Sequence, residues 1–219
     1  LGIGSSAIDR VGRDLVTWRR RCHALGPTVS VRAILEVGAA ALGAILGFET
    51  PTDVEEVDGA IAATLRGHSQ PVALLVTSWG NRLDNLWRPA VRLALERRAP
   101  WCLLFNGTHL RVVDAGRVFA RRHLEFALDA TLEDRRSLAA FWTVLNASTL
   151  AGSGAGGQST PLRSLVDGSD RHASGVCRSL KDGVLAASAD VLGALVERTK
   201  ARSSERLDVD FEQALTIVY

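Results

Sequence analysis

The chain has 219 residues, of which 47% are hydrophobic and 23% charged, which suits one sizeable α/β domain with a helical appendage. No apolar run is long enough to span a bilayer, and the first residues lead directly into charged ones rather than into a signal peptide, so we expect a cytoplasmic protein without membrane contact. A net charge of +2 permits contact with nucleic acid but does not argue for it. The cysteines Cys22, Cys102 and Cys177 lie too far apart for a CxxC zinc or redox motif.

Two helices are predicted at the amino-terminal end. Apolar residues recur every three or four positions from about Ser6 to Leu25 and again from about Ser30 to Leu46, where Gly47 ends the pattern. Residues 48–66 fit either a short helix or a weak strand, and the pattern does not decide between them.

Two buried strands are predicted in the middle of the chain. Val72–Thr77 and Trp101–Phe105 are uninterrupted apolar runs, which is typical of strands covered on both faces. An amphipathic helix from about Leu86 to Arg98 separates them. Asn106-Gly107 then predicts a hairpin.

The next elements complete the predicted α/β domain. A strand at His109–Val113 and a turn at Asp114–Arg117 are followed by residues of shared parity, which predict one long last strand from Val118 to Leu128. Residues 131–134 resemble a capping box and predict a helix that begins at Thr131. Strands and helices in this order predict a mixed sheet flanked by helices.

A change in composition predicts the domain organisation. Residues 150–160 are rich in glycine and serine and predict a linker between an α/β domain at 1–149 and a helical segment at 161–219. In that segment an apolar stripe from Val176 to Leu195 needs a partner to cover it. The chain has no methionine, even at position 1, and its last apolar pattern, 210–219, ends without a cap. We therefore expect it to be a piece of a longer protein.

Several segments, in this order and spacing, resemble the amino-terminal region of type IIG restriction-modification enzymes, in which that region is fused to an adenine-specific DNA methyltransferase. They are Leu75–Gly80, Trp101–Gly107, Leu110–Asp114 and Arg121–Phe126. Residues 212–219 resemble the first helix of the connector that precedes the methyltransferase domain. The motifs cover about half of the chain, and the strand–turn–strand element also resembles the end of the nuclease domain in type I restriction subunits.

The resemblance implies a PD-(D/E)XK, restriction-endonuclease-like fold. That chemistry needs an Asp at the start of one strand and Glu-x-Lys on the next, so that carboxylates hold Mg²⁺ and the Lys activates water. The strand expected to carry Glu-x-Lys, Leu74–Ser78, has neither a carboxylate nor a lysine. We therefore assign no catalytic and no metal-binding residue, and expect a degenerate nuclease-like domain. S-adenosylmethionine and Mg²⁺ are expected only for a full-length parent, because the Asn-Pro-Pro-aromatic motif of the methyltransferases is absent here.

Two other functions stay open at this point. An acidic cluster could supply displaced ligands to an active metal-dependent endonuclease, or it could be a solvated loop; it comprises Asp53, Glu55, Glu56 and Asp58. Glu36 is either a remnant of a helix-borne ligand or a surface glutamate. Alternatively, the chain is a structural module that docks partner subunits of a defence complex through the helix at 176–196.

Arginines are the candidate DNA contacts, because a planar guanidinium donates hydrogen bonds in pairs to phosphate. The predicted set is Arg82, Arg88, Arg92, Arg111, Arg117, Arg121 and Arg122. No helix start combines Asn, Gln and Arg for reading base edges, so we expect double-stranded DNA to be bound without sequence preference. The sequence thus predicts a DNA-associated amino-terminal module of a restriction-modification or phage-defence protein, which works with a downstream methyltransferase domain or partner subunits.

Overall fold

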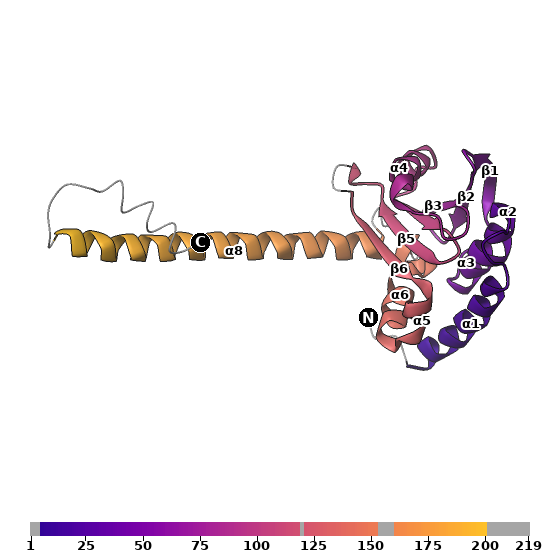
Figure 1. The fold of residues 1–219 in the computed structure, drawn as a ribbon, viewed down its shortest axis with the longest axis horizontal. Coiled ribbons are helices and arrows are strands. Elements are labelled where there is room, and N and C mark those ends of the chain that lie inside the picture. The colour runs from indigo at the N-terminus through magenta and orange to yellow at the C-terminus, as the bar shows by residue number, and fades with distance from the viewer. Residues whose placement is uncertain (1–4, 119–120, 153–159, 201–219) are drawn as a thin grey trace. The chain divides into compact units, whose positions relative to one another are not determined.

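The structure, a computed structural model, describes residues 5–118, 121–152 and 160–200. The chain divides into two compact units, Leu1–Arg163 and Ser164–Tyr219. The first unit contains an α/β fold with a mixed sheet, as predicted (Figure 1).

The sheet has six strands among the described residues, and their order across the sheet is the same as their order in the sequence. They are β1 (Thr52–Val57), β2 (Ala60–Arg66), β3 (Pro71–Val76), β4 (Trp101–Phe105), β5 (His109–Asp114) and β6 (His123–Ala127). Among these six strands, the central pair, β3 and β4, runs parallel, and the other neighbours are antiparallel.

The two predicted buried strands are confirmed as this central parallel pair. Val72–Val76 and Trp101–Phe105 are buried throughout, as expected of strands covered on both faces. A parallel pair needs a crossover, and α4 (Trp87–Glu96), which follows the short helix η2 (Asp84–Leu86), provides it.

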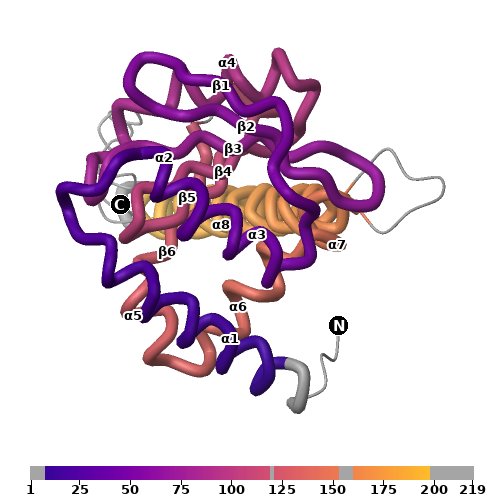
Figure 2. Tube along the Cα trace, turned by 90° about the vertical axis from the view of Figure 1, so that its right-hand side faces the viewer, coloured from indigo at the N-terminus to yellow at the C-terminus, as the bar shows by residue number. Residues whose placement is uncertain are grey.

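Helices cover both faces of the sheet. α4 packs against one face, where Ala90 and Leu93 join the strand residues Leu75 and Leu104. The other face is covered by the amino-terminal helices, which Figure 2 shows on the side of the sheet opposite α4. They are α1 (Ser5–His23), α2 (Val31–Ala33), η1 (Ile34–Ala40) and α3 (Ala41–Ile45).

These amino-terminal helices confirm the two helices predicted there. α2, η1 and α3 form one continuous helical run in which η1 is a π-helical segment. Ser30 caps its start by accepting a hydrogen bond from Ala33 N at 3.3 Å, and Gly47, at φ +88°, follows its end.

Residues 48–66, which the pattern left undecided, contain the β1–β2 hairpin. β1 is an edge strand whose last five residues are exposed, whereas all of β2 except Arg66 is buried. The acidic residues therefore lie on an exposed strand and the turn that follows it, not in a loop.

The prediction of one long last strand from Val118 to Leu128 is wrong. β6 covers only His123–Ala127, and Leu128 is the first residue of α5 (Leu128–Glu133). Ladder pairing ends at His109↔Ala127 because β5 itself begins at His109, so Leu128 has no strand residue opposite it. Its N–H instead donates to Thr108 O at 3.0 Å.

The predicted capping residue is also wrong. The helix that buries Leu138 and Phe141 is α6 (Arg135–Leu145), and Asp134 caps it by accepting a hydrogen bond from Ser137 N at 2.7 Å. Thr131 lies inside α5, where its hydroxyl donates to Ala127 O at 2.7 Å. The hydroxyl that a capping box requires is therefore engaged elsewhere.

The last described elements are α7 (Ala147–Leu150) and α8 (Pro161–Lys200). Residues 153–159 of the predicted linker and the predicted helical pattern at 210–219 lie outside the described residues. α8 confirms that the predicted apolar stripe is helical, and its residues Val176 and Leu180 are exposed. None of the helices described for this chain combines the length and apolar character that crossing a membrane requires.

Candidate nucleic-acid interface

The solvent side of α4 carries two of the predicted DNA contacts, Arg88 and Arg92. They lie one turn apart and are exposed, while Ala90, Leu93 and Ala94 on the other side of the helix are buried against the sheet. Within the residues the structure describes, neither guanidinium has an ion-pair or hydrogen-bond partner. Both side chains are thus available to an anion from solvent.

Arg82 lies just before η2 and is loosely held. Its side chain is 84% exposed, and its Nη2 is 3.6 Å from Asp84 Oδ2. A surface pair of this kind contributes little stability, so a phosphate can replace the carboxylate at low cost.

Arg111 has a different environment from the other predicted contacts. Its side chain is only 7% exposed, and its guanidinium donates to Glu125 Oε2 at 2.7 Å and to Asp84 Oδ1 at 3.0 Å. Arg111 is also the cross-strand partner of Glu125, and its hydrogen bond to Asp84 lowers the pKa of that carboxyl. Arg111 therefore ties η2 and β6 to β5 and does not offer its guanidinium to a ligand in solvent.

The remaining predicted arginines lie at the connection between β5 and β6. Arg121 and Arg122 are exposed and Arg117 is half-buried; Arg117 and Arg122 have interaction partners, whereas Arg121 has none among the described residues. The connection begins at Ala115, which belongs to the apolar cluster under α4. The structure thus brings the start of this connection next to α4, which the sequence pattern did not reveal.

The acidic cluster is neutralised in part by arginines. Asp53 Oδ2 lies 3.5 Å from Arg66 Nη2 and 3.9 Å from Arg97 Nη1, and Arg97 also pairs with Glu55. A hydrogen bond from Thr52 and these arginines lower the pKa of Asp53. In the described ranges, no three His, Cys, Asp or Glu side chains converge as metal ligands would.

Glu36, the second candidate metal ligand, accepts a hydrogen bond from Arg32 Nε at 2.9 Å. Both side chains are 61% exposed and one helical turn apart, which is the geometry of an ordinary surface pair.

A buried arginine, Arg19, links α1 to the carboxyl ends of the strands, and sequence reasoning missed it. Its guanidinium donates to both carboxylate oxygens of Asp129, at 2.6 and 2.8 Å, and to Gly107 O at 2.6 Å. It also lies 5.8 Å from the centre of the Trp79 ring, and His23 Nε2 is 2.9 Å from Asp129 Oδ1. Spacing in the sequence gives no signal for this pair, since 110 positions separate Arg19 from Asp129.

Asp129 makes folding stability depend on pH. The hydrogen bonds from Arg19 lower its pKa from 3.8 to about 2. Because the folded-state pKa is the lower one, the stabilisation is complete above about pH 4 and is lost as pH falls towards 2. We expect Asp129→Asn to flatten this part of the pH profile, as measured by urea unfolding between pH 6 and pH 2. Parallel profiles for the two proteins would contradict this assignment.

A second ion pair, between the buried Asp114 and the part-buried Arg163, lies at the other end of the central strands. Arg163 donates to Oδ2 and Oδ1 of Asp114 at 2.8 and 2.5 Å, and its guanidinium lies 4.5 Å from the centre of the Trp101 ring. Trp101 Nε1 donates to Thr160 Oγ1 at 3.1 Å. These contacts hold the segment from Thr160 to Arg163 against β4 and β5.

Comparison with known proteins adds no relative: no family model, no curated protein and no solved structure matches this chain.

Proposed function

We propose that this chain is a DNA-associated module of a restriction-modification or phage-defence protein, which binds the duplex through backbone phosphates and does not cut it. The observation that carries the proposal is the pair of exposed arginines on α4, Arg88 and Arg92, which have no partner among the described residues. Arg121, which is also exposed and without a partner among the described residues, extends this set, and Arg82 adds an exposed arginine held only by its loose pair with Asp84. An arginine free of carboxylate partners is the group that gains most from a phosphate, because nothing must be displaced.

The order of elements supports a restriction-endonuclease-like fold for the module. The family that the sequence resembles needs an Asp at the start of one strand and Glu-x-Lys on the next. Asp58 lies in the turn after β1, two residues before β2, and the pairing of Ile61 with Val76 places the start of β2 beside the end of β3. This arrangement of β2 and β3 supports the proposal, and Asp58 is then a displaced candidate for the first carboxylate.

The second half of that nuclease site is lacking on β3. The strand offers only aliphatic side chains, followed by Thr77 and Ser78. The Thr77 hydroxyl already accepts a hydrogen bond from Asn81 Nδ2 at 3.0 Å. A single exposed Asp and two hydroxyls are a weak ligand set for Mg²⁺, which favours binding without hydrolysis. In this proposal S-adenosylmethionine and Mg²⁺ belong to the full-length parent, and α8 leads to its methyltransferase part or to partner subunits.

DNA binding tests the proposal directly. We expect Arg88→Ala with Arg92→Ala to weaken binding of a labelled duplex and to lower the log–log salt slope by about two units, roughly one for each arginine–phosphate pair removed. The measurement is fluorescence anisotropy at several salt concentrations with duplexes of unrelated sequence. The matched control is Arg21→Ala with Arg32→Ala, which removes two exposed arginines from the opposite helical layer and should leave the slope unchanged.

Three results of the same experiments would overturn the proposal. Equal slopes for both double variants would place the DNA contacts elsewhere. Absence of binding at low salt would favour the docking module. Nicking of supercoiled plasmid with Mg²⁺ or Mn²⁺, abolished by Asp53→Ala or Asp58→Ala, would favour the active endonuclease.

The docking alternative is favoured by one observation on α8. Several of its large apolar residues are exposed, with 45% of Val176 and 63% of Leu180 accessible to solvent. A helix in a protein gains most of its stability by packing its apolar face against other elements, so a partner that covers these residues would stabilise α8.

A further inference from the structure

An open groove lies between α1 and α6. Figures 1 and 2 show these two helices in the first unit, on the side of the sheet opposite α4. Its volume is about 480 Å³. The lining residues are Ile8, Asp9, Gly12, Arg13, Val16, Thr17, Arg20, Arg135 and Leu138. The two helices approach closely here because Gly12 has no side chain: a Cβ at this position would lie 3.0 Å from Leu138 Cδ2.

The floor of the groove is apolar and would be covered best by an apolar group of a ligand. Ile8, Val16 and Leu138 provide it, and Val16 remains 38% exposed. The Thr17 hydroxyl, the neutral polar group of the lining, donates to Arg13 O at 3.0 Å and so is already satisfied.

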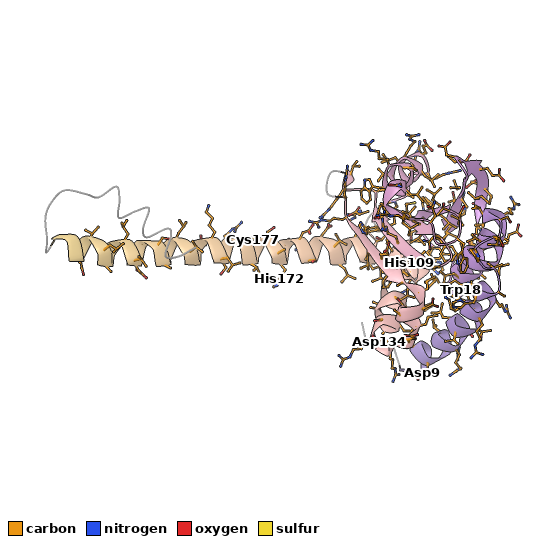
Figure 3. The ribbon with its side chains drawn as sticks, in the orientation of Figure 1. Asp9, Trp18, His109, Asp134, His172 and Cys177 are labelled. Carbon is orange, nitrogen blue, oxygen red and sulfur yellow. The ribbon has the colours of Figure 1, made fainter. Side chains whose placement is uncertain are left out.

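The rim of the groove is basic. Arg13 and Arg20 lie seven positions apart on α1, hence about two turns and ~10 Å apart on the same side of the helix. At one end Arg135 Nη2 lies 2.9 Å from Asp9 Oδ1, the only carboxylate among the described lining residues. Figure 3 labels Asp9 on α1 and Asp134 directly before α6. After this pairing the rim keeps the two positive charges of Arg13 and Arg20.

We propose that this groove is a docking site for an acidic amphipathic helix of a partner protein. The apolar face of such a helix would cover Val16 and Leu138, and carboxylates one or two turns apart would meet Arg13 and Arg20. The apolar floor argues against duplex DNA at this place, because a backbone bound here would cover aliphatic side chains with charged phosphates. The site is independent of the DNA surface proposed on α4.

A charge exchange tests the proposal on the full chain. The probes are two fluorescent peptides of about 18 residues, or five helical turns. Both carry leucines on one helical face, and one is flanked by Glu, the other by Lys. We expect the Glu peptide to bind about tenfold more tightly, and Arg13→Glu with Arg20→Glu to reverse that preference. Val16→Ser should weaken both peptides alike, because it removes part of the apolar floor.

The control is Arg21→Glu with Arg32→Glu, which changes the net charge equally but lies outside the groove and should preserve the preference. Circular dichroism of each variant checks that the fold is retained. Equal affinity for the two peptides, or a preference unchanged by Arg13→Glu with Arg20→Glu, would overturn the proposal. So would loss of duplex DNA binding in that variant with no peptide bound, since the groove would then be part of the DNA surface.

Discussion

Replacing Asp114 by alanine is expected to lower the free energy of unfolding of the first unit by about 3 kcal/mol. The reason is the part-buried guanidinium of Arg163, whose side chain is only 18% exposed and would lose the carboxylate that accepts two of its hydrogen bonds. Asp114 also accepts from Gly116 N at 3.0 Å. All five tryptophans lie in the first unit, so urea unfolding followed by tryptophan fluorescence measures this unit within the full chain.

The double variant Asp114→Ala with Arg163→Met removes both charges of the pair, whereas Asp114→Ala leaves the Arg163 charge without its partner. The difference in unfolding free energy between the two variants measures the cost of that unpaired charge. Methionine keeps the contact with the Trp101 ring without a charge, so the double variant should be more stable than Asp114→Ala alone. The matched control is Glu36→Ala, which breaks an exposed pair and should cost no more than about 0.5 kcal/mol. A loss for Asp114→Ala as small as that of the control would show that this ion pair does not hold the first unit together.

The central elements were predictable because local pattern and tertiary environment agree there. Short uninterrupted apolar runs such as Val72–Val76 and Trp101–Phe105 are typical of a strand with helices on both sides. β1 gives no such signal, because an exposed edge strand of acidic residues has no buried parity to show. At β6 the parity continued to Leu128, but a strand can extend only as far as its neighbour, and β5 begins at His109. Strand ends are therefore set by pairing that a single segment does not encode.

The candidate site was predictable only in part, because contacts between residues far apart in the sequence decide which arginines are free. The spacing of Arg88 and Arg92 predicts that they share the outer face of a helix, and they do. Arg111 is also among the predicted DNA contacts, because the sequence does not show that it is paired. Its carboxylate partners, Asp84 and Glu125, lie 27 and 14 positions away. One local signal was present: Arg111 stands between Leu110 and Val112 in a strand with neighbours on both sides, where a charge is buried and must be paired.

Gly107→Ala is expected to destabilise the first unit by about 3 kcal/mol, combining backbone strain and a clash. The hairpin that Asn106-Gly107 predicted joins β4 to β5, with Gly107 at φ +82°. A Cβ at this position would lie 2.3 Å from Cε3 and 2.6 Å from Cζ3 of the Trp79 ring. The ring cannot simply move away, because the Arg19 guanidinium lies 5.8 Å from its centre and is itself held by Gly107 O and Asp129. Urea unfolding of the full chain measures the loss.

Gly59→Ala is the matched control, because Gly59 has a similar φ of +77° but nothing within 4 Å of an added Cβ. It should therefore show the backbone cost alone, about 1 kcal/mol. The difference between the two substitutions then measures the contact of Gly107 with Trp79. If that contact is the cause, Gly107→Ala made in a Trp79→Ala background should cost no more than Gly59→Ala. Equal losses for Gly107→Ala and Gly59→Ala in the parent chain would mean instead that the Trp79 ring is free to move, and that Arg19 does not fix the carboxyl ends of the strands.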